Sequence, residues 1–297
     1  MKQSALIAGA VSSVALLIEG EGFRWMFAQY LTMRALSCVA SNIVQRYPGR
    51  LKLLEEYGDA AVFALGSGQA VYSFIVRPDT IDREYGHFLT WVADMDPALI
   101  ELFRKMLQSN KWDDGQAAKL LARSARILSP EALKRLAANL HAPLSCGVIH
   151  PESDCFNRIV YSWLSTFRTV FPMYFSLHLA PPLLFKTKAF LADPVASALR
   201  SAHNGVRSSS FMSSYIMFFQ TLLCTQRNLM ALGAIREEWR YAYWLMGFLA
   251  SASIFVEKKE RRSELALYVR FCSLPFFRCC PRAGWHSIAH WWKRNGR

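Results

Sequence analysis

Long apolar stretches recur along most of this chain, and they constrain its fold more than any other feature. Several of them hold about 14–18 residues between charges, whereas a straight membrane-spanning helix needs roughly 20. A soluble all-α protein would show polar faces at helical spacing on most of these stretches. Here the stretches mix small and large apolar residues with hydroxyls, which lipid tolerates because Ser and Thr bond to their own helix or a neighbour. The sequence therefore predicts an all-α, multi-pass membrane protein. The stretches are 5–18, 25–44, 60–76, 159–185, 208–230, 241–256 and 264–277.

Composition and charge placement favour the same class of protein. Apolar residues make up 53% of the chain and charged residues only 19%, against roughly 25% charged residues in ordinary soluble domains. The net charge is +13, and the basic residues lie beside apolar stretches, as in EKKERR and WWKRNGR. Attraction of Lys and Arg to anionic lipid explains this placement, and no nucleic-acid recognition motif occurs. We therefore expect membrane lipids as partners, with further copies of the chain or other membrane proteins, and no nucleic acid.

The 7 cysteines indicate neither a disulfide framework nor a zinc ribbon. Their number is odd, their spacing is irregular, and no pair of C-x-x-C units occurs. Those inside apolar stretches, Cys224 among them, are expected to behave as small hydrophobes. A reducing compartment is the expected environment.

Residues 79–145 carry amphipathic helical patterns instead of continuous apolar ones. Asp96 before Pro97 and Ser129 before Pro130 are candidate N-caps of two helices. In these helices Arg and Lys lie on one face, and Leu and Ala on the other. The pattern fits both a small soluble helical insert and helices that lie along a membrane surface.

An internal repeat relates the start of the chain to its C-terminal part. Residues 8–36 align without gaps with residues 246–274, and many of the non-identical pairs exchange one apolar residue for another. We predict a helix, a charged corner and a second helix in each copy. The identities are Gly9/Gly247, Ser13/Ser251, Glu19/Glu257, Arg24/Arg262, Ala28/Ala266, Tyr30/Tyr268 and Leu36/Leu274.

The identical residues have a mechanical meaning in each copy. A glycine and a serine four residues apart let two helices approach closely, so Gly9 and Gly247 are expected at close helix contacts. The glutamate and arginine of each corner are expected to brace it as an exposed pair, which contributes only about 0–1 kcal/mol. On this basis Glu257→Gln alone should do little. Because a cleavable signal peptide has no reason to copy an internal segment, the opening residues are expected to belong to the mature protein.

Four segments of the second half resemble the transmembrane protein 135 family. They read IHPESDC, YSWLSTFRTVFPMYFSLHLAPPLLFK, SALRSAHNGVRSSSFMSSYIMFFQTLLC and GFLASASIFVEKKERRSELALYV. Family members show a His-Pro and Cys element, two characteristic helices and an A-S-x-x-x-x-E-x-K-x-R-R hairpin. His150, Pro151 and Cys155 match the first of these elements. The segment GSGQAVYSFIVRPDTIDREYGHFLTW looks like the family's closing portion, so the order of elements here differs from the family's.

The resemblance implies an integral membrane protein of peroxisomes or mitochondria. The family is related to the mitochondrial import-channel and peroxisomal membrane protein superfamily, is linked to organelle dynamics and lipid metabolism, and has no established enzymatic activity. We therefore expect a non-catalytic protein without a cofactor, channel-like or related to transport. One alternative is a membrane-embedded enzyme that uses His150 with Glu152 or Asp154. Another is a soluble helical binding module.

Four regions follow from these patterns. Residues 1–78 are predicted to form a first membrane repeat portion of three helices, and residues 79–145 the amphipathic helical insert. Residues 146–283 would form the second membrane repeat, with the His-Pro and Cys element at its entrance and four helices. Residues 284–297 read as a basic aromatic tail at the membrane interface, where indole rings prefer to lie.

The segment CGVIHPESDC is a candidate metal site that the sequence does not favour. It places Cys146, His150, Glu152, Asp154 and Cys155 within ten residues, but their spacing matches no standard zinc pattern. A tetrahedral site would need a fourth ligand from elsewhere. The favoured interpretation is a capped entrance to a helix, with Ser153 or Asp154 as N-cap, and no bound metal.

Arg168 is a charged residue within the apolar stretch 159–185. A charge at that place is costly in lipid, so it is functional by default. The other interpretation is a side chain that reaches a nearby interface, with Pro172 breaking the helix there. The sequence supports both equally.

Overall fold

The structure is a computed structural model that describes residues 52–81, 83–109, 129–139, 146–185, 187–235 and 238–273, with isolated positions at 31, 35, 39, 42, 43, 46, 115, 118, 119, 121 and 122. The chain divides into two compact units, one of residues 1–58 with 274–297 and the other of residues 59–273. Most described residues belong to the second unit, which is considered by itself below.

The described secondary structure is helical throughout, which confirms the predicted all-α class. No helix among the described residues combines the length and the apolar character needed to cross a membrane. In chain order the elements are α3 (Lys52–Ile75), η1 (Pro78–Thr80), α4 (Arg83–Val92), α5 (Pro97–Ser109), α7 (Pro130–Asn139), α8 (Cys146–Ile149), α9 (Cys155–Phe185), α10 (Thr187–Ala192), α11 (Pro194–Ala231), α12 (Tyr241–Ala250), η2 (Ser251–Val256) and α13 (Lys259–Ser273).

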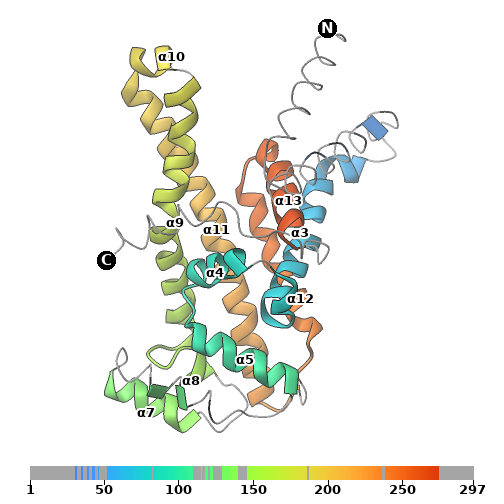
Figure 1. Ribbon diagram of the computed structural model, residues 1–297, viewed down its shortest axis with the longest axis vertical. Helices are drawn as coiled ribbons and strands as arrows, with labels where there is room; N and C mark the ends of the chain where they lie inside the picture. The colour runs from blue at the N-terminus through green and yellow to red at the C-terminus, as the bar shows by residue number, and fades with distance from the viewer. Residues whose placement is uncertain are drawn as a thin grey trace, which may run out of the picture. The chain divides into compact units, whose positions relative to one another are not determined.

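Helices α9 and α11 form a long antiparallel hairpin that α10 closes at one end (Figure 1). Near one end of the hairpin, Trp163 Nε1 donates a hydrogen bond of 3.3 Å to Ser214 Oγ. Further along, a Cβ placed on Gly205 would lie only 3.2 Å from the Cα of Phe175. The two helix backbones therefore approach closely at Gly205, as small residues permit.

The hairpin buries many hydroxyl-bearing side chains together with large apolar residues such as Val170, Phe211 and Leu223, and it also exposes a number of large apolar residues. Ser213 Oγ donates to Ser209 O at 2.8 Å and Ser201 Oγ to Ser197 O at 3.0 Å, so buried hydroxyls bond to their own helix, as the sequence predicts. The buried polar residues are Ser162, Thr166, Ser197, Ser201, Ser208, Ser209, Ser213, Gln220, Gln226 and Arg227. Exposed large apolar residues include Val160, Leu164, Leu177, Leu183, Leu184, Phe185, Val195, Leu199 and Val206.

Helix α9 continues through Pro172, so the expected break at this residue is wrong. An internal proline removes one backbone hydrogen bond, but packing on both sides can hold the helix. The rings of Trp163, Phe167, Phe171 and Phe175 stack in a row with centroids 5.4, 5.7 and 6.0 Å apart. This row runs past the proline, and α11 packs along the same helix.

The amphipathic helices of residues 79–145 belong to the main hydrophobic core. Both predicted N-caps are confirmed, since Ala98 N donates to Asp96 Oδ1 at 2.8 Å and Ala132 N donates to Ser129 Oγ at 3.3 Å. The apolar face of α5 is covered by protein. The core contains Phe74, Ile75, Val76, Leu99, Ile100, Leu102, Phe103, Leu107, Leu136, Val148, Ile149, Phe219, Leu223, Tyr243, Met246 and Ala250.

The second copy of the predicted repeat has the expected helix, corner and helix. Helix α12 and η2 precede the corner, and α13 follows it. A Cβ on Gly247 would lie 2.7 Å from Ser67 O and 2.9 Å from Val71 Cβ, which confirms the close contact predicted for this glycine. Ser251 is buried beside it.

The first copy of the repeat cannot be compared with the second. Gly9, Ser13, Glu19 and Arg24 lie outside the described residues, as does the tail 284–297.

Candidate metal centre

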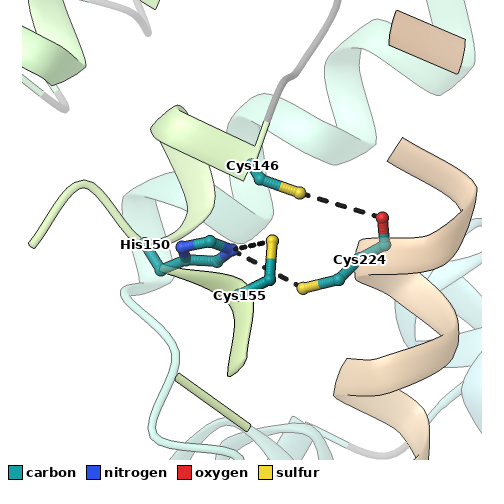
Figure 2. Close-up of side chains that lie close together, drawn as sticks. All are labelled: Cys146, His150, Cys155 and Cys224. Atoms are coloured by element: carbon teal, nitrogen blue, oxygen red, sulfur yellow. Dashed lines mark hydrogen bonds between the residues drawn. The ribbon is translucent and has the colours of Figure 1, made fainter. Parts of the chain in front are cut away.

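Four side chains from separate elements meet beside α11 (Figure 2). Cys146 comes from α8, His150 from the loop after it, Cys155 from the start of α9 and Cys224 from α11. Their three sulfur atoms and one imidazole nitrogen all lie within 4.8 Å of one another. The Sγ atoms of Cys155 and Cys224 are each 3.5 Å from His150 Nε2. The four residues therefore form a compact Cys3His set.

The short helix α8 fixes the first two members of the set. His150 N donates to Cys146 O at 2.9 Å, which places the two residues one turn apart. Between them, Val148 and Ile149 are buried in the main core. Val148 and Ile149 thus hold this single turn against the core, and Cys146 and His150 at its two ends point toward α11.

The entrance to α9 supplies the third member. Arg158 N donates to Asp154 O at 2.9 Å, so Asp154 occupies the N-cap position, one of the two predicted for it. Cys155 follows as the first helical residue. The capped entrance and the cysteine cluster therefore occupy the same segment and do not exclude each other.

The imidazole of His150 is held in one orientation. Its Nδ1 lies 2.8 Å from the carbonyl oxygen of Ser153, and the side chain is buried. Because a carbonyl only accepts hydrogen bonds, Nδ1 carries the proton in the neutral ring. Nε2 then turns its lone pair toward the sulfur atoms of Cys155 and Cys224. A backbone carbonyl commonly orients a metal-binding histidine in this way.

Two further polar residues of α11 lie one turn beyond Cys224. Asn228 reaches two of the sulfurs, with Oδ1 3.5 Å from Cys146 Sγ and Nδ2 3.9 Å from Cys155 Sγ. The guanidinium of Arg227 interacts electrostatically with Cys146. A buried positive charge and an amide therefore lie beside the cysteines.

Arg227 is itself firmly held. Its side chain is 1% exposed, pairs with Glu238 and donates to the hydroxyl of Tyr243. It also lies 5.0 Å from the centroid of the Phe103 ring, a cation–π contact. These contacts come from α5, α12 and the segment before α12, so Arg227 links the cysteine cluster to the main core.

Two of the thiols, those of Cys146 and Cys155, have raised pKa values. Hydrogen bonding with Cys224, together with burial, raises the pKa of Cys146 to about 12. Burial, followed by hydrogen bonding with Cys146, raises the pKa of Cys155. Burial acts to lower the pKa of His150, but hydrogen bonds to Cys146 and to the Ser153 carbonyl outweigh it, and the pKa is raised. A nucleophilic cysteine needs a lowered pKa, so these thiols lack the electrostatics of a catalytic one.

The other candidate residues of this region do not join the cluster. Glu152 and Asp154 are exposed, and both ring nitrogens of His150 face other groups. The arrangement therefore does not form the histidine–carboxylate pair that the enzyme alternative requires. Arg168 is exposed on α9, so its charge is not buried within the described unit.

The corner after η2 differs from its expected form. Glu257 is 2% exposed, so the expectation of an exposed pair with Arg262 is wrong. Its carboxylate lies 3.7 Å from Arg261 Nη1. Arg261 Nη1 also lies 2.8 Å from His178 Nε2 and donates to Ser208 Oγ at 2.6 Å. The carboxylate is buried because α9 and α11 present polar partners around Arg261.

Arg262 braces the corner through the backbone. Its Nε donates to Glu257 O at 3.1 Å, and its Nη2 donates to Phe255 O at 3.1 Å. These carbonyls end η2, where the last groups of a helix lack partners. The predicted role of Arg262 as a brace holds, with carbonyl groups as its partners.

Cys224 is the member of this set that sequence reasoning missed. It lies in an apolar stretch, far along the chain from the other three members, where a cysteine looks like any small hydrophobe. The nearby residues Gln226, Arg227 and Asn228 are the sequence feature that could have indicated a site at this turn. Three consecutive polar residues in an apolar stretch indicate that the same turn of α11 serves something other than core packing.

Comparison with known proteins found no matching family model, no similar curated protein and no similar solved structure. What this site can bind therefore follows from its own residues and their geometry.

Proposed function

We propose that this chain is a non-catalytic helical membrane protein of an organelle, with the α9–α11 hairpin facing lipid. The observation that carries the proposal is the distribution of side chains on this hairpin. Hydroxyls and Gly205 lie between the two helices, and large aliphatic residues lie on the outside. Helices in lipid associate through small and hydroxyl-bearing residues, because the surrounding chains are as apolar as leucine.

The exposed apolar surface of the hairpin is costly in water. Leu177 is 59% exposed, Leu184 71% and Phe185 83%. Burying a side chain of this size stabilises by about 1.5–3 kcal/mol relative to leaving it in water. Contact with lipid supplies this burial for the whole surface at once.

An apolar groove lies at the α10 end of the hairpin. Its volume is about 480 Å³, enough for part of an acyl chain. Only apolar residues line it, namely Phe175, Phe190, Pro194, Val195, Ala198, Leu199 and Ala202. The groove supports lipid as the occupant of this surface, because it offers no polar group to an aqueous ligand.

The compartment and the kind of activity rest on the resemblance to the transmembrane protein 135 family. On that ground we place the protein in the peroxisomal or mitochondrial membrane, with a channel-like or transport-related role linked to lipid metabolism. The arrangement of His150 favours this over the enzyme alternative, because its ring nitrogens face a carbonyl and thiols rather than a carboxylate.

Fractionation of the tagged full chain tests the proposal. The protein should sediment with peroxisomal or mitochondrial markers and stay in the pellet after carbonate extraction. Release into the supernatant without detergent would overturn the proposal and leave the soluble helical binding module.

Paired substitutions test whether the hairpin faces lipid. Leu177→Arg with Leu199→Arg should abolish carbonate-resistant membrane association, because a charge in lipid costs about 2.5–3.5 kcal/mol on insertion scales. Leu177→Ile with Leu199→Ile is the matched control and should behave as the parent chain. Equal membrane association of both double variants would show that this face does not contact lipid.

A further inference from the structure

We propose that Cys146, His150, Cys155 and Cys224 bind one zinc ion in a closed, structural site. The inference goes beyond the membrane proposal and does not depend on it. Three thiolates and one imidazole are a recognised ligand set for structural zinc. The three protons of the cysteines leave to solvent on binding, so the occupied centre carries one net negative charge.

The distances fit a tetrahedral site. Zinc binds sulfur at about 2.3 Å and nitrogen at about 2.0–2.1 Å. At tetrahedral angles, a sulfur ligand and a nitrogen ligand of the same ion are therefore about 3.6 Å apart. Cys155 Sγ and Cys224 Sγ are each 3.5 Å from His150 Nε2. Two sulfurs of such a site lie about 3.8 Å apart. All four donor atoms lie within 4.8 Å of one another, about 1 Å beyond the sulfur–sulfur distance of an occupied site.

The imidazole is already in the tautomer that zinc requires. The Ser153 carbonyl accepts the Nδ1 proton at 2.8 Å and leaves Nε2 as the free donor atom. Such an outer partner fixes the ring and raises the basicity of the ligating nitrogen. Little reorganisation of His150 is therefore needed when the ion enters.

The size and chemistry of the set exclude other common centres. Calcium and magnesium take oxygen ligands, and the four donor atoms here are sulfur and nitrogen. A two-iron cluster distributes its ligands over two metal atoms, whereas these atoms all lie within 4.8 Å of one another. A single ion with four protein ligands has no open position, so the site is structural rather than catalytic.

Neighbouring residues partly balance the charge of the occupied centre. Arg227 lies on α11 one turn beyond Cys224, and its positive charge interacts with Cys146. Asn228 Nδ2 donates toward Cys155 Sγ at 3.9 Å, a weak contact that a thiolate would strengthen. Because Arg227 is also paired with Glu238, these groups offset the negative charge of a three-thiolate zinc centre only in part.

The ion would join the entrance of α9 to the far end of α11. The opposite end of the hairpin is closed covalently through α10, so zinc would tie the one end that no chain connection holds (Figure 1). Because Arg227 reaches Phe103 and Tyr243, the same ion also anchors the hairpin to the main core.

Metal analysis of the purified full chain in detergent tests the proposal. We expect one zinc per chain by elemental analysis, lost in His150→Gln and in Cys224→Ser. Glu152→Gln and Asp154→Asn are matched controls from the same segment, whose exposed side chains lie outside the set, and both should keep the zinc. Zinc retained by Cys224→Ser, or iron with acid-labile sulfide in place of zinc, would overturn the assignment.

Cobalt substitution of the parent chain gives a result that does not depend on the folding of any variant. After chelation and addition of Co²⁺, we expect the strong visible bands of a tetrahedral cobalt centre and a sulfur-to-cobalt charge-transfer band. Addition of Zn²⁺ should remove both. A chelated chain that keeps its helix content but gives no such bands contradicts the proposal.

Discussion

Gly247 is the residue where a single added methyl group meets the backbone of another helix. Its Cβ would lie 2.7 Å from Ser67 O on α3, a distance that real Cβ atoms essentially never show. The neighbour is backbone, so it cannot rotate away. Bulk at this position must therefore separate α12 from α3.

Gly247→Ala should destabilise the protein by about 1–3 kcal/mol, the usual cost of overpacking a dense contact. Gly86→Ala is the control, because a Cβ there would meet only Ile81 Cγ2 at an ordinary 3.8 Å. The midpoint of thermal unfolding in detergent should fall for the first variant and hold or rise for the second. Equal midpoints would contradict the close contact.

Single residues also show what local sequence can reveal. Asp96 and Ser129 were predictable N-caps, because a cap depends on a few consecutive residues. The burial of Glu257 was not, because it is set by Arg261, His178 and Ser208. His178 and Ser208 lie on other helices, and nothing in the corner sequence indicates them.

At the scale of elements, the corner between η2 and α13 is held by buried charge. Glu257 offers Arg261 its carboxylate, and Lys258 Nζ donates to Asn204 Oδ1 on α11 at 2.8 Å. Arg207 Nε on α11 donates to Val256 O at 2.7 Å. The corner is thus bonded to α11 by side chains from both sides.

Glu257→Gln should lower stability by about 1–3 kcal/mol, because the substitution leaves the partly buried Arg261 without its carboxylate. Glu260→Gln, at an exposed position three residues on, is the matched control and should change stability by less than about 0.5 kcal/mol. Thermal unfolding of the two variants side by side measures the difference. An effect of Glu257→Gln no larger than that of the control would restore the original expectation of an exposed pair.

The elements themselves were predictable to different degrees. Apolar periodicity gave the all-α class, and the helix-corner-helix form of residues 246–274 followed from a charged interruption between two apolar runs. The docking of α5 on the main core did not follow, because an amphipathic face looks the same whether protein or lipid covers it. The continuity of α9 agrees with the single apolar stretch 159–185. The alternative of a break at Pro172 was wrong because a proline rule is local, whereas the stacked ring row that passes Pro172 is visible only in the helix.

At the scale of the whole molecule, the Cys3His centre should control how firmly the hairpin is held at one end. Chelation of zinc should raise backbone hydrogen exchange around residues 146–158 and 220–228, where the ligands lie. Residues 187–200, at the other end of the hairpin, should exchange at an unchanged rate. Hydrogen exchange with mass spectrometry of the chain in detergent, with and without chelator, measures both regions. A uniform rise along α9 and α11 would mean that the ion stabilises the whole unit rather than one end.

The centre itself could be predicted only in part. Three of its members stand within one ten-residue segment, but their spacing matches no standard zinc pattern, and the favoured prediction there was a capped helix entrance with no bound metal. The fourth depends on how α9 and α11 pair along their full lengths, which is a long-range result of Gly205, the buried hydroxyls and the stacked rings. The residues around Cys224 alone do not indicate which part of α9 it will lie beside.

The spacing of the ligands along the chain has a consequence for biosynthesis. Cys146, His150 and Cys155 leave the ribosome roughly 70 residues before Cys224, which is several seconds of synthesis at about 5–20 residues per second. During this interval the nascent segment would hold the ion only weakly and exchangeably, through three ligands with water as the fourth, as Cys224→Ser would before it loses zinc on purification. Arrival of α11 then exchanges that water for a thiolate, so the last coordination bond forms only when the two helices have paired in the correct register. A mispaired hairpin would keep an exchangeable ion, which gives the cell a chemical difference between finished and unfinished chains.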